Sequence, residues 1–105
     1  MSIWNSTSIE DTPHIALARW RVYQTETGEH HFVGYNMTER EGRVSSAIQS
    51  FDKNTRIGIT RSGRHYKLSD NSGANLDAEY VWGRWVEINK VTEITDVTEQ
   101  YEQTL

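Results

Sequence analysis

The basic side chains that could bind an anion lie close together in one short stretch of the chain. Residues 53–67, KNTRIGITRSGRHYK, contain five lysines and arginines and no acid. Arginine and lysine bind phosphate and carboxylate oxygens, so this stretch predicts a contact surface for nucleic acid or for an acidic protein partner. The candidate contact residues are Arg56, Arg61, Arg64, His65 and Lys67.

The histidines offer a different chemistry. A small enzyme or a metal-dependent protein built on His30, His31, His65 and nearby carboxylates is the alternative hypothesis. Neighbouring side chains on a strand point to opposite faces, so His30 and His31 do not easily bind one ion together. The sequence contains no nucleophile elbow, no helical metal-binding pair and no phosphate-binding loop. We therefore expect a non-enzymatic interaction module without metal or cofactor.

Length and composition limit the class of protein. The chain has 105 residues, which suits one domain, and it has no cysteine, which excludes disulfides and thiolate metal sites. No apolar run approaches the roughly 20 residues that cross a membrane. The first residues lack the basic start and apolar stretch of a signal peptide. We expect a cytoplasmic protein that does not bind membranes.

The acidic charge is concentrated at the two ends of the chain. The net charge is −4, but residues 14–91 hold all 11 lysines and arginines and carry a net positive charge. Binding responds to the local field of a patch, so an overall acidic protein can still present a basic surface. We expect a flexible N-terminal arm over residues 1–13, one globular domain over residues 14–98 and a flexible acidic tail over residues 99–105.

Two β-hairpins must position these charged side chains. Strand-forming runs flank Thr27-Gly28 and Ser62-Gly63, where glycine supplies the positive φ of a tight turn. Two-residue turns would place Glu26 opposite Glu29 and Arg61 opposite Arg64. In that register the apolar pairs Ile59–Tyr66 and Ile57–Leu68 share one face.

The two tips carry charges of opposite sign, and four interpretations of the arginine pair remain open. The arginines are solvated, or they pair with carboxylates of this protein, including Glu26 and Glu29. Otherwise they contact an external anion such as nucleic-acid phosphate, or an acidic protein partner. Tip-to-tip pairing could take place within one chain or across a homodimer.

The remaining segments complete an α+β domain. RVSSAIQSF predicts a third strand, and VTEITDVT predicts a closing strand, although the spacing of Val91, Ile94, Val97 and Tyr101 also fits a helix. Residues 77–90 fit a helix or a strand, and the spacing of Ala78, Val81, Trp82, Trp85 and Ile88 or Asn89 favours a helix, with Asn75 or Asp77 as its N-cap. We expect a mostly antiparallel sheet of about five to six strands, with Trp82 and Trp85 packing the helix against one face.

Four segments of the chain carry a resemblance to known proteins. HFVGYN, REGRVSSAI, TRSGRHYKL and DAEYVWGRW resemble a pattern in a family of small uncharacterised bacterial proteins, some of them carried with mobile elements. The resemblance covers about residues 19–97 and implies that this part is a self-standing domain. It favours interaction over metabolism, and it implies no activity, substrate or site residue.

Overall fold

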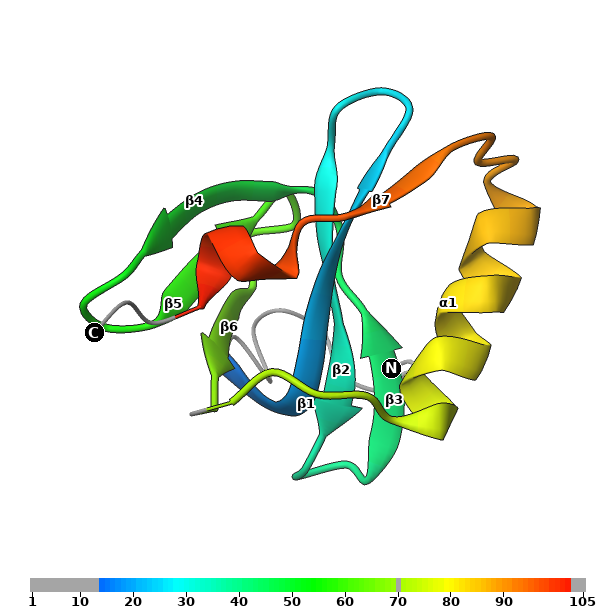
Figure 1. Cartoon of the computed structure of the whole chain (residues 1–105). Helices are drawn as coiled ribbons and strands as arrows, with labels where there is room; N and C mark the ends of the chain where they lie inside the picture. The colour runs from blue at the N-terminus through cyan, green and yellow to red at the C-terminus, as the bar shows by residue number, and fades with distance from the viewer. Residues whose placement is uncertain (1–13, 70, 103–105) are drawn as a thin grey trace.

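The computed structural model describes residues 14–69 and 71–102, where one α-helix packs on a seven-stranded sheet (Figure 1). In chain order the elements are β1 (His14–Thr25), β2 (His30–Asn36), β3 (Glu41–Val44), β4 (Ile48–Asp52), β5 (Ile57–Thr60), β6 (His65–Leu68), α1 (Leu76–Ile88), β7 (Ile94–Asp96) and the 3₁₀ helix η1 (Thr98–Tyr101). The predicted α+β class is confirmed, but the sheet has more strands than the expected five to six. Within these two ranges no helix is long and apolar enough to cross a membrane.

The strands lie in the order β3-β2-β1-β6-β5-β4, and β7 pairs with β1 outside that path. All pairs of strands are antiparallel except β1 with β6. The ladder between β1 and β2 is irregular between Ala18 and Arg21, where Arg19 takes a φ of 49°. Because β1 changes direction there, its first part pairs with β6 and its last part with β7.

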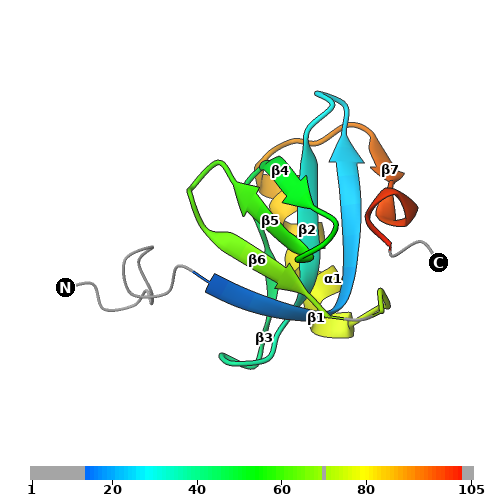
Figure 2. The same cartoon turned by 90° about the vertical axis from the view of Figure 1, so that its left-hand side faces the viewer.

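Two separate cores lie on the two sides of β1 and β2. Figure 2 shows β4, β5 and β6 toward the viewer and α1 behind them, with β1 and β2 between. The larger core consists of Ile15, Leu17, Trp20, Val22, Phe32, Tyr66, Leu68, Val97 and Tyr101. The smaller core lies under α1 and consists of Val33, Ala78 and Trp82 with four half-buried neighbours.

The predicted helix is confirmed as α1. The side chain of Asn75 accepts a hydrogen bond from the backbone N–H of Ala78 at 2.9 Å, so Asn75 is the N-cap. Ala78 and Trp82 are buried on the inner face, whereas Ile88 is 71% exposed and does not belong to that face. The start of the helix lies directly on β3, because Gly42 has no side chain to hold the two apart.

The first hairpin has a three-residue turn instead of the predicted two-residue turn. The backbone N–H of Thr25 bonds to the Glu29 carbonyl at 3.0 Å, and Gln24 pairs with His30. Gly28 takes a φ of 88°, as the third residue of such a turn requires. The predicted register is wrong by one residue, so the two glutamates are not directly opposite each other.

The second hairpin also has a three-residue turn, and its predicted register is also wrong by one residue. The backbone N–H of Thr60 bonds to the Arg64 carbonyl at 3.1 Å, Gly58 pairs with Tyr66, and Gly63 takes a φ of 91°. Arg61 therefore does not lie opposite Arg64, and the predicted Ile59–Tyr66 pair does not form.

A shift of one residue exchanges the two faces of a strand, and this decides which side chains of β5 are buried. Gly58 and Thr60 face the larger core together with Arg56, while Ile57 and Ile59 are half-buried on the other side. The ring of Phe32 fills the space that a side chain at residue 58 would need.

The predicted third strand is two strands. Residues 45–47 separate β3, which pairs with β2, from β4, which pairs with β5. At this break the hydroxyl of Ser45 accepts a hydrogen bond from the backbone N–H of Phe32 at 2.9 Å and donates to the Ser46 carbonyl at 2.7 Å. The Ser45 hydroxyl thus accepts the hydrogen bond from Phe32 N–H that a backbone carbonyl would otherwise accept. The backbone can then leave β3 and cross to β4.

The folded domain extends past the predicted boundary at residue 98. Tyr101, in η1, is 9% exposed and belongs to the larger core, where its ring contacts Phe32 and Phe51. Part of the predicted acidic tail is therefore an element of the domain. The predicted N-terminal arm and residues 103–105 lie outside the described residues.

Candidate functional site

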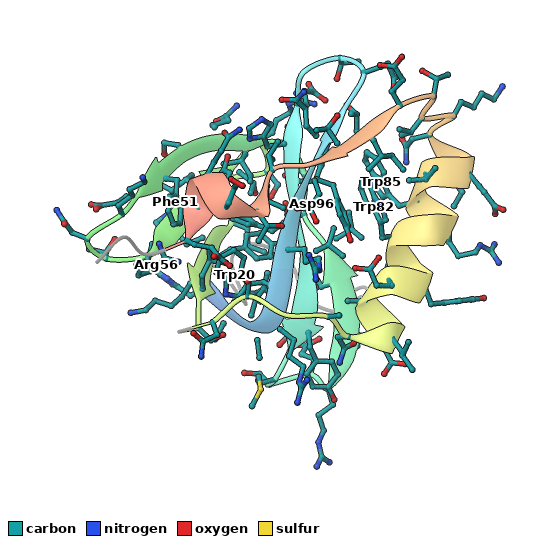
Figure 3. All side chains as sticks on the ribbon, in the orientation of Figure 1. Trp20, Phe51, Arg56, Trp82, Trp85 and Asp96 are labelled. Carbon is teal, nitrogen blue, oxygen red and sulfur yellow. The ribbon has the colours of Figure 1, made fainter. Side chains whose placement is uncertain are left out.

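Two of the five predicted contact residues are buried. Arg56 is 6% exposed and Arg64 is 9% exposed, because the register of the second hairpin turns both toward the core side. The guanidinium of Arg56 lies over the rings of Trp20 and Phe51 (Figure 3). The predicted basic surface therefore consists of fewer side chains than the sequence suggested.

The other three predicted contact residues lie nearer to solvent. Arg61 and Lys67 are exposed and His65 is half-buried. Arg61 is not isolated, because its Nη2 forms an ion pair with Glu29 Oε2. Of the four interpretations of the arginine pair, the structure supports pairing with the protein's own carboxylates, at Arg61.

The two hairpin tips are thus joined within one chain. The backbone N–H of Arg61 bonds to the Ala47 carbonyl at 2.8 Å, and that of Ser62 bonds to Ser46 Oγ at 3.1 Å. Glu26, on the other tip, accepts hydrogen bonds from the backbone N–H groups of Thr92 and Glu93 at 3.0 and 3.4 Å. Of the two forms of tip pairing that the sequence left open, within one chain or across a homodimer, the Glu29–Arg61 contact is of the first kind.

The three histidines of the alternative hypothesis lie in different surroundings. His30 bonds to Tyr101 Oη and Gln24 Oε1, and the ring of His65 contacts the ring of His14 at 4.8 Å. His31 lies on the opposite face of β2 from His30, under α1. Across residues 14–69 and 71–102, no group of three or more histidines and carboxylates is arranged to hold a metal ion.

A pocket of about 320 Å³ lies between the joined tips and the C-terminal end of α1. The two hairpins form one side and the helix forms the other. Its lining includes Glu26, Glu29, His31, Arg61, Trp85 and Asn89. We call it the tip pocket.

His31 brings an unpartnered polar atom to the tip pocket. The side chain is 3% exposed, and its Nδ1 lies 2.9 Å from the Ser45 carbonyl oxygen, which can only accept a hydrogen bond. Nδ1 therefore carries the proton, and in the neutral ring Nε2 is an acceptor. Within residues 14–69 and 71–102, Nε2 is buried and has no hydrogen-bond partner, and Glu29 Oε1 lies 4.0 Å from it.

Aromatic rings form the helix side of the tip pocket. The ring of Trp85 lies 4.6 Å from that of His31 and stacks on Trp82 at 5.3 Å, and Trp82 stacks on Tyr23 at 5.1 Å. Figure 3 shows both indoles between α1 and the strands. Tyr23 donates a hydrogen bond to Glu79 at 2.8 Å; its burial and this carboxylate raise the pKa of its hydroxyl.

The carboxylates give the tip pocket a negative charge. Backbone N–H groups, that of Glu26 itself and then that of Thr92, hold the pKa of the Glu26 carboxyl below its ordinary value, so Glu26 stays ionised. Glu29 carries a second charge, and Arg61 offsets one of the two. The charged groups on the lining therefore favour a cation.

The sequence singled out His31 but did not reveal which residues surround it in the tip pocket. We expected Trp85 to pack in the core and Glu29 to serve only at a hairpin tip. The three-residue turn places Tyr23 opposite His31, so that both face the helix. The sequence signal that could have revealed the site is the spacing of Glu29 and His31, two residues apart where the chain leaves the turn and enters β2.

Comparisons with models of known protein families, with curated proteins and with solved structures find no match to this chain. The function must therefore be argued from the geometry of the tip pocket and from the charges around it.

Proposed function

We propose that this protein is a non-enzymatic binding module that holds a cationic nitrogen group of its partner, an ammonium or a guanidinium, in the tip pocket. One observation carries the proposal: among the residues that the structure describes, His31 Nε2 is buried without a hydrogen-bond partner, and His31 lines a pocket that also contains the Glu29 carboxylate. A buried polar atom without a partner costs free energy, and a ligand that donates a hydrogen bond removes that cost.

The distance between the two acceptors suits a nitrogen donor. His31 Nε2 and Glu29 Oε1 are 4.0 Å apart, so one nitrogen can lie at hydrogen-bond distance, roughly 2.9 Å, from both. Arg61 pairs with the other oxygen of Glu29, Oε2, and Oε1 is the oxygen nearer to His31. An ammonium group has three N–H donors, enough to bond both acceptors at once.

The indole of Trp85 supports the same class of ligand. It lines the tip pocket beside His31, and the faces of tryptophan rings attract cations. The methylene groups of a lysine or arginine side chain would also pack on it. A lysine or arginine side chain of a partner protein would supply both the cation and the apolar stem.

The test compares two ligands that differ only in the charged group. We expect Nα-acetyl-lysine methylamide, which keeps the side-chain ammonium, to bind saturably in calorimetric titration. Nα-acetyl-norleucine methylamide, which lacks the ammonium, should not bind. Glu29→Gln and His31→Phe should each weaken binding by about tenfold or more, since each removes one acceptor. Glu39→Gln is the matched control, because Glu39 is exposed on the turn after β2 and away from the tip pocket.

Equal binding of the two ligands would contradict the proposal, as would unchanged affinity in both site variants. Circular dichroism of each variant establishes that it is folded before its affinity is compared.

Binding of nucleic acid or of an acidic protein partner is the second candidate function. Exposed Lys67 and Arg61 and half-buried His65 favour it, although Arg61 already pairs with Glu29. Affinity should fall steeply with salt and be lost in Arg61→Ala/Lys67→Ala. Absence of binding to DNA and RNA at low salt would contradict the nucleic-acid form of this hypothesis.

A further inference from the structure

Arg56 is a buried cation whose hydrogen-bonding groups are unused. Its side-chain nitrogens Nε, Nη1 and Nη2 are all buried, and none has a hydrogen-bond partner in the part of the chain that the structure describes. Arginine remains charged at any pH that proteins tolerate, so the group cannot lower this cost by losing a proton. Buried charges in proteins are normally paired and hydrogen-bonded. The side chain therefore lacks an acceptor.

Two aromatic rings stabilise part of the positive charge of Arg56, but they accept none of its hydrogen bonds. The guanidinium carbon Cζ lies 5.7 Å from the centre of the Trp20 ring and 5.3 Å from that of Phe51. Cation–π attraction acts between the charge and the ring faces. The N–H bonds lie in the guanidinium plane and need oxygen atoms at its edge. The rings thus hold the guanidinium in place while its donors stay available.

The backbone fixes this position from both sides. The N–H of Arg56 bonds to the Asp52 carbonyl at 2.8 Å, and its carbonyl accepts from Leu68 N–H at 2.9 Å. Arg56 takes a φ of 64°, a left-handed conformation that costs free energy in any residue except glycine. Strain of this kind is often found at binding sites, where the surroundings hold the residue in place.

We propose that Arg56 is the receptor of an oxyanion, a carboxylate or a phosphate group, that bonds to the edge of its guanidinium. The planar fork of arginine matches two oxygens of such a group, and this geometry distinguishes arginine from lysine. The exposed turn of residues 53–55, which precedes Arg56, is the route of access. This turn lies beside the edge strand β4, and edge segments open at a lower cost than central strands.

The Arg56 site is separate from the tip pocket. Arg56 lies on the side of β1 and β2 that faces away from α1, whereas Trp85 lies under α1 (Figure 3). The rings that hold the Arg56 guanidinium, Trp20 and Phe51, do not line the tip pocket. The two sites also take ligands of opposite charge, so each can be tested without the other.

The test measures thermal unfolding in sodium phosphate, sodium acetate and sodium chloride at equal ionic strength. A ligand that binds the folded state raises the Tm. At an oxyanion concentration about ten times its Kd, we expect the Tm of the wild-type protein to exceed its value in chloride by about 4 °C or more. A rise in phosphate alone identifies phosphate groups, a rise in acetate alone identifies carboxylates, and a rise in both supports the shared oxyanion chemistry.

Arg56→Met separates binding from a merely structural role. Methionine fills the space without the charge, so the variant should be at least as stable as the wild type in chloride and should lose the response to oxyanions. Lys53→Met removes one exposed positive charge from the same turn and should keep the response. Should Arg56→Met fail to fold, the Nε–H resonance of Arg56 in the wild-type protein must still shift on addition of phosphate or acetate. Equal responses in wild type and Arg56→Met, or an Nε–H resonance that does not move, would overturn the proposal.

Discussion

At the scale of single residues, adjacent histidines on β2 have opposite environments. His31 packs under α1 with one free nitrogen, whereas both ring nitrogens of His30 are bonded, Nδ1 to Tyr101 Oη at 2.7 Å and Nε2 to Gln24 Oε1 at 2.9 Å. The amide oxygen of Gln24 only accepts, so Nε2 of His30 carries the proton and Nδ1 accepts from the tyrosine. In this arrangement neutral His30 connects the first hairpin to η1.

The pKa of His30 predicts how stability depends on pH. Burial, and next the neighbouring His31, hold the pKa of His30 below its ordinary value. The unfolded chain, with a histidine pKa of about 6.5, then binds a proton before the folded protein does. The contribution of His30 is therefore complete above about pH 6.5 and is lost as the pH falls through its folded-state pKa.

Urea denaturation at about pH 7.5 and pH 5.5 measures this effect. We expect the free energy of unfolding of the wild type to fall between the two, and His30→Gln to show a smaller fall. His14→Gln is the control, because His14 is exposed at the start of β1, and it should behave as the wild type does. An equal fall in wild type and His30→Gln would show that other groups cause the dependence.

At the scale of elements, the contact between α1 and β3 depends on a missing side chain. A Cβ atom on Gly42 would lie 2.5 Å from the backbone of Asp77 and from the N–H nitrogen of Ala78, closer than real atoms approach. These are backbone atoms of the first helical turn, which Asn75 caps, so the rotation of a side chain cannot relieve such a clash. The position of α1, and with it one side of the tip pocket, follows from this glycine.

Two glycine substitutions test that dependence with the same chemical change. Gly42→Ala should lower the free energy of unfolding by about 1–3 kcal/mol, as overpacking of a close contact does. Gly83→Ala lies within α1 with open space around its Cβ, and should raise stability by up to about 1 kcal/mol, because alanine favours helix. Urea denaturation measures both, and similar effects of the two would refute the proposed close packing.

The elements also show which features of the fold were predictable. The spacing of Ala78 and Trp82 and the cap at Asn75 are local, and the helix was predicted from them. Gly28 and Gly63 located both turns. The register of the second hairpin was not predictable, because the inner residue opposite Tyr66 is Gly58, whose space the ring of the distant Phe32 fills. The alternation of apolar residues along β5 cannot reveal that a core position has no side chain of its own and is filled by a ring from another strand.

At the scale of the whole molecule, the sheet is joined at the tips as well as along its strands. The ion pair between Glu29 and Arg61 connects the two hairpins, and its two residues are 32 positions apart in sequence. The Arg61–Ala47 and Ser62–Ser46 hydrogen bonds attach the second tip to the segment between β3 and β4. This long-range closure forms the tip pocket, and neither hairpin alone could have predicted it. The same holds for Arg56, whose aromatic neighbours come from β1 and β4.

Charge reversal measures the contribution of the joined tips. Arg61→Glu should lower the free energy of unfolding by up to about 1 kcal/mol, since the pair is partly exposed, and Glu29→Arg/Arg61→Glu should restore most of the loss. Because the contact lies within one chain, sedimentation velocity should give the same oligomeric state for all three proteins. A change of oligomeric state in the single variant alone would favour pairing between copies.

The stacked tryptophans under α1 have an optical consequence. The indoles of Trp82 and Trp85 are 5.3 Å apart and only 11° from parallel, so their electronic transitions must couple. Such coupling gives a paired positive and negative band in circular dichroism, which depends on the mutual orientation of the two rings. A ligand in the tip pocket touches Trp85 and would change that signal, whereas an anion at Arg56 lies beside Trp20 and would leave it unchanged. The protein therefore contains an intrinsic chromophore pair that would report on one of the two proposed sites and not on the other.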